Sequence, residues 1–361
     1  MQHAAPPARI VRPARERSLD NFFVDATRNP LYKEKQAKKE LVMYQTAIAD
    51  IKTRLSAAKN ILIASHVRPD GDAIGSLLGL GLALQHAGKN VQMVLQDGVP
   101  ASFRYLPGSD KIQLEPQGTW DTFISVDCAD FKRLGKGFEN LGKPDINIDH
   151  HITNQKFGTL NLIMGDEVAT AAILTQCLPQ WDLEINAAVA TALLTGIVTD
   201  TLGFRTANTT PEALRLSAEL MERGADLDDL YSRSLVRRAY PAARYWGAGL
   251  SSLERTEDLV WGTLTLEDRK SAGYAGNDDA DLINIISAID GSKVGMIFVE
   301  QADQHVKISW RAIEDGIDVS KVAKHFNGGG HAAAAGADIP GSLSEIQPRV
   351  LQTTREMLGL S

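Results

Sequence analysis

Apolar and polar positions in the first half of the chain alternate in a way that predicts strands and helices in turn. Apolar runs of strand length at 61–65 and 90–95 enclose a helical segment that begins near Ala73 and ends at Gly88. Further runs of strand length follow at 122–126 and 146–148. Alternation of this kind is typical of an α/β fold, with a mostly parallel sheet and helices on both of its faces.

A second pattern begins after residue 241 and predicts a smaller α/β domain. A helix toward Phe326 and a run of glycines close this pattern. Because the strand pattern restarts after a polar, arginine-rich stretch, we expect a separate core here. Its expected elements are a strand at 260–265, a helical segment at 280–289 and two alternating strands at 294–299 and 305–310.

These patterns divide the chain into four segments. The first is rich in proline and arginine and lacks periodicity, so we expect it to be disordered. An amphipathic helix that ends near Ala58 opens the first domain. Thr210 and Pro211 mark the start of a helix in the connector, because threonine can cap it and proline suits the first helical position. The predicted boundaries are 1–35 for the extension, 36–205 for the first domain, 206–241 for the helical connector and 242–361 for the second domain.

Composition and charge narrow the class of protein. The 361 residues carry a formal net charge of -7, which argues against a protein that grips long duplex nucleic acid. No apolar run reaches the roughly 18 residues of a membrane span, and the N-terminus has no apolar signal core. The two cysteines, Cys128 and Cys177, lie in apolar segments, which suits the reducing cytoplasm. We therefore expect a cytoplasmic protein without a membrane partner.

Acidic and histidine residues form four clusters in the first domain. Each cluster follows or overlaps an apolar run, so each would lie at the end of a buried element, where open α/β sheets place their sites. A single histidine or aspartate is more often structural, but four such clusters predict a shared site. Two other acidic groups, 226–229 and 278–279, are expected at helix starts and in solvent. The four clusters are His66 with Asp70 and Asp72, then Asp127, then Asp149 with His150 and His151, and then Asp200.

The types of side chain in these clusters indicate which metal they suit. Imidazoles and carboxylates without a well-placed thiolate favour Mn²⁺ or a similar divalent ion over a structural zinc. Gly71 is expected to let the 66–72 loop turn, so that the side chains around it converge. Two ions about 3.5–4 Å apart can lower the pKa of a water toward roughly 7 and bind the oxygens of a phosphoryl group. The clusters thus predict a two-metal site whose natural reaction is phosphoester hydrolysis.

Five motifs that occur in order resemble those of the DHH phosphoesterase superfamily. Their joint occurrence over about 59–337 is highly specific, and the last motif is similar to that of the DHH-associated substrate-binding domain. The two-domain layout is similar to bacterial nanoRNases and 3'-phosphoadenosine-5'-phosphate (pAp) phosphatases. One departure is Ala335, where the family often carries serine. The motifs are HVRPDGDAIGS at 66–76, SVDCAD at 125–130, DHH at 149–151, TGIVTDT at 195–201 and NGGGHAAAAG at 327–336.

The resemblance implies a role for each metal-site residue. Asp149 would orient the His150 ring without binding the metal itself, as carboxylates next to metal-binding histidines usually do. His151 would face the substrate phosphate as a hydrogen-bond donor or acid. Mg²⁺ or Co²⁺ could take the place of Mn²⁺. The implied ligands are His66, Asp70 and Asp127 for one ion and Asp72, Asp127, His150 and Asp200 for the other, so that Asp127 bridges them.

The resemblance also implies a substrate-binding role for the second domain. Arg311 is similar to the arginine that meets the substrate's phosphate or terminal nucleotide, and its guanidinium suits a bidentate phosphate contact. The glycines Gly328, Gly329 and Gly330 would allow close backbone approach and direct N–H groups at an anion, with His331 as a further donor.

The activity that the resemblance implies is hydrolysis of very short RNA and of pAp, by in-line attack of a metal-activated hydroxide on phosphorus in a cleft between the domains. Two alternatives stay open: a cyclic- or linear-dinucleotide phosphodiesterase and, from another class, a non-catalytic nucleotide-binding regulator. A single-strand DNA exonuclease would need a further domain, and an inorganic pyrophosphatase would lack the glycine–histidine motif. Substrate preference, polarity of digestion and oligomeric state, with a homodimer as one option, also stay open.

Overall fold

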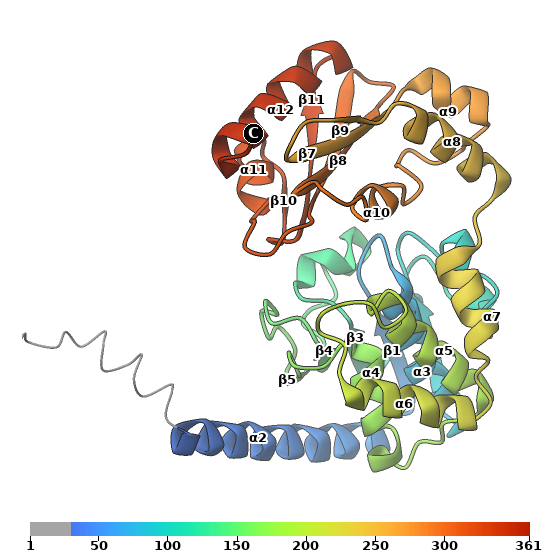
Figure 1. Cartoon of the computed structure of the whole chain (residues 1–361). Helices are drawn as coiled ribbons and strands as arrows, with labels where there is room; N and C mark the ends of the chain where they lie inside the picture. The colour runs from blue at the N-terminus through green and yellow to red at the C-terminus, as the bar shows by residue number, and fades with distance from the viewer. Residues whose placement is uncertain (1–29) are drawn as a thin grey trace, which may run out of the picture. The chain divides into compact units, whose positions relative to one another are not determined.

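The computed structural model describes residues 30–361 and divides into two compact units between Arg237 and Arg238. Helix α2 (Pro30–Ala57) begins six residues before the expected start at Gln36, and its N-terminal part extends away from the first unit (Figure 1). Residues 30–35, which we expected to be disordered, therefore belong to a helix. The rest of the predicted extension lies outside the described residues. None of the helices described is both long enough and apolar enough to cross a membrane.

The first unit is built on a five-stranded sheet in which all strands run parallel, in the order β2-β1-β3-β4-β5 (Figure 1). The predicted parallel α/β architecture is confirmed. The strands are short and mostly buried, which explains why they read as continuous apolar runs. Their bounds are β1 Asn60–Ala64, β2 Asn90–Val94, β3 Thr122–Val126, β4 Ile146–Asp149 and β5 Leu160–Ile163.

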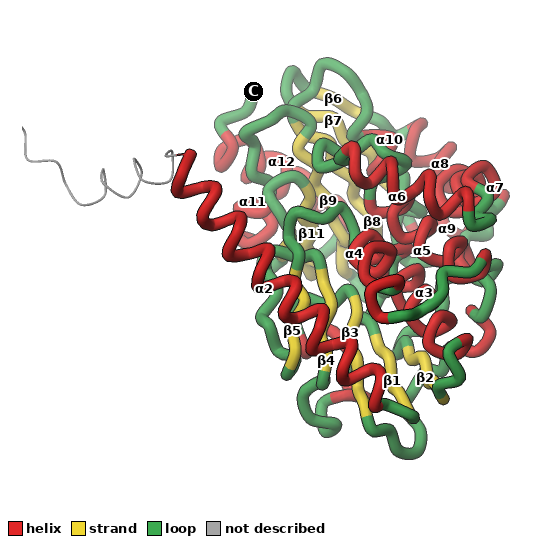
Figure 2. Tube along the Cα trace, turned by 90° about the horizontal axis from the view of Figure 1, so that it is seen from below, coloured by secondary structure: helices red, strands yellow, loops and turns green. Residues whose placement is uncertain are grey.

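The two faces of this sheet are covered differently. Helices α3 (Gly71–His86) and α4 (Thr170–Cys177) pack against one face, and α5 (Ala187–Asp200) packs on these two helices (Figure 2). The other face is covered by short 3-10 turns and loops, so the expectation of helices on both faces was wrong. Large aromatic side chains contribute much of this cover, because each one buries a large apolar area. They include Phe123 and Phe138, which stack with their centroids 5.8 Å apart, and Phe157.

Glycines bring helices α3 and α5 unusually close together. A Cβ at Gly75 would lie 2.5 Å from the Ala192 carbonyl oxygen, and a Cβ at Gly71 would overlap the Thr199 side chain. Gly71 has no positive φ and is the first residue of α3, so its role is close packing and not the turn that we expected. This contact places the start of α3 beside the end of α5.

The segment expected as a connector folds mainly with the first unit. Helix α6 (Pro211–Glu222) buries Leu216 and Leu220 in the core of that unit. The predicted threonine cap is confirmed, because Thr210 Oγ1 accepts a hydrogen bond from the Ala213 amide at 3.1 Å. Helix α7 (Leu227–Tyr231) and a π-helical turn at Ser232–Val236 complete the unit. The 226–229 acidic run is a helix start, as expected, since Asp226 caps α7.

The second unit contains a six-stranded mixed sheet in the order β10-β11-β9-β8-β7-β6. Strands β7 and β8 are parallel and the other neighbours are antiparallel. The strands predicted near 260–265, 294–299 and 305–310 are confirmed as β7, β8 and β9. The bounds are β6 Glu254–Arg255, β7 Leu259–Leu264, β8 Val294–Glu300, β9 His305–Ala312, β10 Gly329–Gly330 and β11 Ala334–Pro340.

Helices cover both faces of this second sheet. The long helix α12, which we did not predict, begins with a capping box between Ser342 and Glu345. The helix expected over 280–289 is reduced to the single turn α10. Of the acidic pair 278–279, Asp279 lies at a helix start, as expected, and accepts a hydrogen bond from the Ile283 amide. Both residues are half-buried, so the expectation that they are solvated was wrong. The Asp278 carboxylate accepts hydrogen bonds from the Tyr274 hydroxyl and the Ala280 amide. The helices are α8 Tyr240–Ser251, α9 Leu266–Ala272, α10 Ile283–Ile286, α11 Ser320–His325 and α12 Leu343–Leu358.

Candidate metal centre

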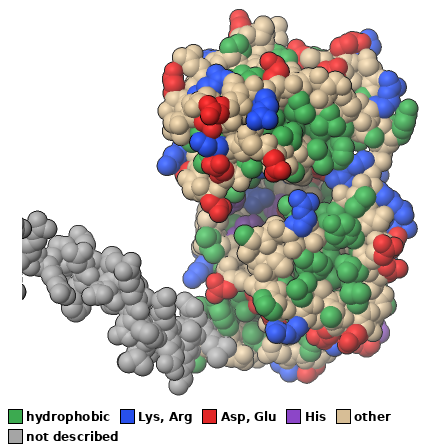
Figure 3. Space-filling model, viewed as in Figure 1, with side chains coloured by type: hydrophobic (Ala, Val, Ile, Leu, Met, Phe, Trp, Pro, Cys, Tyr) green, Lys and Arg blue, Asp and Glu red, His purple; other side chains and the backbone are tan. Residues whose placement is uncertain are grey.

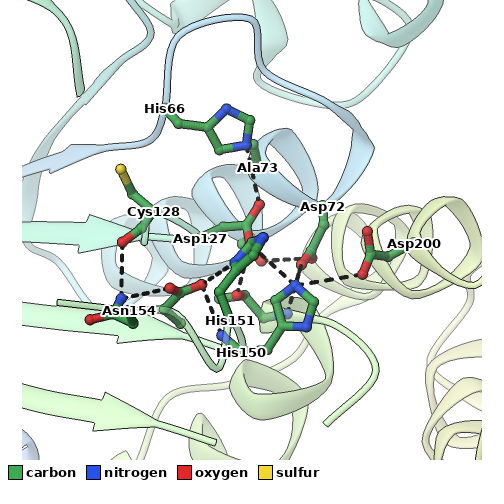
Figure 4. A network of polar contacts seen from close by, with 12 residues as sticks. His66, Asp72, Ala73, Asp127, Cys128, His150, His151, Asn154 and Asp200 are labelled. Carbon is green, nitrogen blue, oxygen red and sulfur yellow. Dashed lines mark hydrogen bonds and ion pairs between the residues drawn. The ribbon is translucent and has the colours of Figure 1, made fainter. Parts of the chain in front are cut away.

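The four predicted clusters meet at one edge of the first sheet (Figure 4). Because the strands are parallel, their carboxyl ends lie together and deliver the residues that follow β1, β3 and β4 to the same place. Asp200 arrives differently, as the last residue of helix α5. Ligand atoms lie within 4.8 Å of one another in three groups: His66, Asp70 and Asp127; Asp72, His150 and Asp200; and Asp127, His150 and His151.

Asp127 lies at the centre of the cluster. Its two carboxylate oxygens face different histidines: Oδ2 is 3.6 Å from His66 Nε2, and Oδ1 is 3.7 Å from His150 Nε2. The residue is buried and has a left-handed backbone with φ of 51°, which an aspartate adopts at a cost. Burial raises the pKa of Asp127, but the surrounding histidines outweigh this effect and lower it to about 2. Oδ2 has no hydrogen-bond partner among the described residues, so this buried anionic oxygen has only the 3.6 Å contact with His66 Nε2.

Backbone carbonyl groups contact the Nδ1 atoms of His66 and His150. His66 Nδ1 lies 2.9 Å from the Val67 oxygen, and His150 Nδ1 lies 3.3 Å from the Glu167 oxygen. Since a carbonyl can only accept, His150 Nδ1 carries the proton and its Nε2 keeps a lone pair. His66 Nδ1 also lies 3.1 Å from Arg133 Nη2, which can only donate, so its two contacts favour opposite tautomers. Both Nε2 atoms face carboxylates of the cluster, His66 toward Asp70 at 3.7 Å and His150 toward Asp200 at 3.5 Å.

Asp72 and Asp200 are acidic groups that burial destabilises in their charged form. Asp72 is buried, and its oxygens accept hydrogen bonds from the Thr170 and Ala171 amides at the N-terminus of α4. Burial, together with the carboxylates of Asp127 and Asp200, raises the pKa of Asp72 well above its usual value. Burial also raises the pKa of Asp200, to about 6, although His150 opposes the shift. Without a cation, this concentration of carboxylates therefore retains protons.

Asp149 contacts a different histidine ring from the one that we expected. Its Oδ1 accepts hydrogen bonds from His151 Nδ1 at 2.7 Å and from the His150 backbone amide at 2.9 Å (Figure 4). The expectation that Asp149 orients the His150 imidazole was wrong, because that ring uses the Glu167 carbonyl instead. Burial alone would lower the pKa of His151, but the carboxylates of Asp149 and Asp127 outweigh this effect and raise the pKa to about 9.

The donor set fits divalent cations. Oxygen and imidazole donors that converge around an unpaired carboxylate oxygen are typical of sites for Mn²⁺ and similar ions. A thiolate does not compete, since burial raises the pKa of Cys128 to about 12 and its Sγ donates to the Asp130 carbonyl. The geometry therefore supports the binding of divalent metal.

In the second unit, the predicted substrate-binding residues lie on one corner of the sheet. Arg311 on β9 pairs in register with Ala334 on β11, and His331 forms a tight turn with the same Ala334 through both backbone groups. Gly329 and Gly330 form strand β10 and pair with β11, so these two glycines belong to the sheet edge instead of an open loop. A side chain at Gly328 would overlap the backbone of β11. Burial lowers the pKa of Arg311, opposed by the carboxylates of Asp279 and Asp281.

Three functional contacts were missed from the sequence. Thr170 donates from its hydroxyl to Asp127 at 3.0 Å, across 43 residues of chain, and no local signal marks it. Arg133 places its Nη2 3.1 Å from His66 Nδ1. Asn154 donates to Asp149 at 2.6 Å, and its place five residues after that aspartate could have drawn attention to it.

Comparison with known proteins agrees with this geometry. The model of the DHH family N-terminal domain matches residues 60–197, and that of the DHHA1 domain matches residues 270–358. A bifunctional oligoribonuclease and PAP phosphatase NrnA from Thermus thermophilus is 38% identical over 304 residues, which cover 82% of this chain and 90% of the relative. The protein of the same name from Bacillus subtilis is 25% identical over 79% of this chain and 91% of its own length.

A solved structure supports the same assignment of the fold. The exopolyphosphatase-related protein from Bacteroides fragilis superimposes with a TM-score of 0.81 at 26% identity, covering 87% of this chain and 97% of that one. Its likeness extends over both units. The chain therefore belongs to the DHH family, with an N-terminal DHH domain followed by a DHHA1 domain.

Proposed function

We propose that this protein is a phosphoester hydrolase that degrades very short oligoribonucleotides and also accepts pAp. The observation that carries the proposal is the convergence of three histidines and several carboxylates around Asp127, whose buried Oδ2 has no hydrogen-bond partner among the described residues. The relative from Thermus thermophilus, whose name states both activities, supports the choice of substrate. Buried free cysteines at 128 and 177 support a cytoplasmic location.

Six residues of the cluster would hold two divalent cations, with Mn²⁺ as the expected ion and Mg²⁺ or Co²⁺ as substitutes. Such ions lower the pKa of a water toward roughly 7 and neutralise charge on a phosphoryl group. The two oxygens of Asp127 already face different histidines, which suits a carboxylate shared between both ions. We assign His66, Asp70 and Asp127 to one ion and Asp72, Asp127, His150 and Asp200 to the other.

His151 is the residue that we assign to proton transfer. Asp149 fixes its Nδ1 and stabilises the protonated ring, which leaves Nε2 to donate a proton to the oxygen that leaves phosphorus. Arg311 and His331, with the glycines at 328–330, would bind the terminal phosphate or nucleotide. A guanidinium offers two parallel N–H donors for such a group.

The charge of the protein suits a short substrate. On the face drawn in Figure 3, Lys and Arg side chains are scattered among acidic and hydrophobic ones and form no continuous track. With a net charge of -7, the chain gains little from a long row of phosphate contacts. A substrate with one or two phosphates needs only local cationic groups.

The direct test is to assay pAp, pApA, pGpG and a labelled RNA 5-mer side by side with Mn²⁺. We expect the RNA 5-mer and pApA to be cleaved to mononucleotides and pAp to lose a phosphate. A preference for pGpG alone would indicate a dinucleotide phosphodiesterase instead. Binding of these nucleotides without hydrolysis would indicate a regulator.

A further inference from the structure

We propose that Asn154 is a positioning residue, which holds Asp149 so that Asp149 can fix the His151 ring for proton transfer. This inference rests on the proposed function of the site. Asn154 lies in the loop after β4, three residues beyond His151, and no ligand role is assigned to it. Figure 4 shows it on the opposite side of the network from Asp72 and Asp200.

The carboxamide of Asn154 uses its full hydrogen-bonding capacity. Nδ2 donates to Asp149 Oδ2 at 2.6 Å and to the Cys128 carbonyl at 3.1 Å. Oδ1 accepts from the Lys156 amide at 2.6 Å and from Asn147 Nδ2 at 3.1 Å. A flipped amide would set its oxygen against two acceptors and its NH₂ against two donors, so only one orientation is satisfied.

The next link in the chain is the Asp149 carboxylate. It is fully buried, and its second oxygen, Oδ1, accepts from the His151 ring and the His150 backbone. The bond from Asn154 therefore fixes the rotation of the carboxylate, and that rotation determines where Oδ1 meets the imidazole. Without Asn154, Oδ2 would lose its donor inside the protein, and the carboxylate would turn to recover one.

This arrangement differs from that of another half-buried asparagine in the same unit. Asn161 on β5 pairs in register with Asn147, and it too makes hydrogen bonds through both ends of its side chain. Both bonds go to Gly158, with Oδ1 accepting at 3.0 Å and Nδ2 donating at 2.8 Å. Asn161 therefore stabilises a local turn only, and it serves as a matched control.

The proposal concerns one chemical step. In hydrolysis a water oxygen forms a new bond to phosphorus, the bond to a ribose oxygen breaks, and His151 gives that oxygen a proton. The proton that the attacking water loses returns to His151 through solvent. A p-nitrophenolate leaves without needing a proton, so a p-nitrophenyl ester of a 5'-mononucleotide bypasses the step in which Asn154 would act.

We expect Asn154→Ala to lower kcat on pApA by about tenfold to a hundredfold, with KM and Mn²⁺ affinity changed by less than about threefold. The p-nitrophenyl ester should lose less than about threefold. In a His151→Gln background, Asn154→Ala should cost less than about twofold more, because a residue that acts through His151 has nothing left to position. Asn161→Ala should match the wild type on both substrates.

Asn154→Asp supplies a second variant if alanine prevents folding. It keeps the size and the acceptor oxygen but sets a carboxylate against Asp149, so it should lower kcat on pApA at least as far. Equal losses on both substrates, additive losses with His151→Gln, or loss of Mn²⁺ binding would overturn the proposal. If the wild type fails to cleave pApA, the proposed function is at fault. If the wild type is active and Asn154→Ala is too, only this inference fails.

Discussion

The rings of His150 and His151 lie with their centroids 4.4 Å apart, yet their Nδ1 atoms bond to different acceptors. His150 uses the Glu167 carbonyl and directs Nε2 into the carboxylate cluster, whereas His151 uses Asp149. Two adjacent residues of the same type therefore receive different tasks from their partners. The first suits a metal ligand, and the second suits a proton donor.

Metal affinity should depend on pH, because ligands must lose their protons to bind a cation. Burial raises the pKa of Asp200 to about 6, so this group is mostly protonated below that pH and mostly charged above it. We expect the affinity for Mn²⁺ to fall as pH decreases through about 6, with release of at least one proton on binding. Calorimetry in two buffers with different heats of ionisation measures both quantities. An affinity that stays constant from about pH 5 to pH 8 would contradict this explanation.

Replacing either substrate-binding residue of the second unit should separate binding from chemistry. Arg311→Ala or His331→Ala removes a charge-assisted hydrogen bond worth roughly 1.5–3 kcal/mol, so kcat/KM on short RNA should fall about tenfold to a hundredfold or more. Bis-p-nitrophenyl phosphate, which has no nucleotide end, should lose less, and Mn²⁺ binding should be unchanged. Arg355→Ala on α12 provides a control cation. Equal losses on both substrates would rule out the assigned role.

The close contact of α3 and α5 should be sensitive to a single methyl group. In Gly196→Ala the new Cβ would lie 2.7 Å from Asp72 Oδ1 and 2.6 Å from the Ala171 Cβ. We expect a loss of about 1–3 kcal/mol in the free energy of unfolding and weaker metal binding, because Asp72 must move. Gly247→Ala in α8 meets nothing within 4 Å and should instead stabilise by about 0.5–1 kcal/mol. Denaturant unfolding measures the free energy of unfolding of both variants. Equal values for the two variants would show that α3 and α5 can move apart at no cost in stability.

The convergence of the four clusters could be predicted from the sequence, because each cluster follows or overlaps an apolar run. His66, Asp127 and Asp149 lie at the ends of predicted strands, and parallel strands bring such residues together. The partners of these residues could not be predicted in the same way. Thr170 lies 43 residues from Asp127 in the chain. The His150 ring contacts the Glu167 carbonyl and not the expected Asp149 carboxylate, and this choice depends on loop geometry.

Other features depended on packing that no local pattern reports. The left-handed backbone conformation at Asp127 is unfavourable, and the surrounding fold must stabilise it. The backbone preference of aspartate alone therefore does not predict this conformation. The aromatic cover over the second face of the first sheet comes from segments without helical periodicity, which explains why we expected helices there. Gly71 was interpreted as a turn residue because the neighbour that it accommodates, Thr199, lies on another helix.

If Asp127 joins two metal sites into one catalytic unit, as we propose, Asp127→Ala should abolish the activity. The measurement is turnover of pApA with Mn²⁺ by variants whose folding has been verified, with Asp110→Ala on the surface of the same unit as the control. We expect Asp110→Ala to behave as the wild type and Asp127→Ala to have no measurable turnover. A folded Asp127→Ala protein that keeps more than about a tenth of wild-type turnover, a loss below roughly 1.4 kcal/mol, would contradict it.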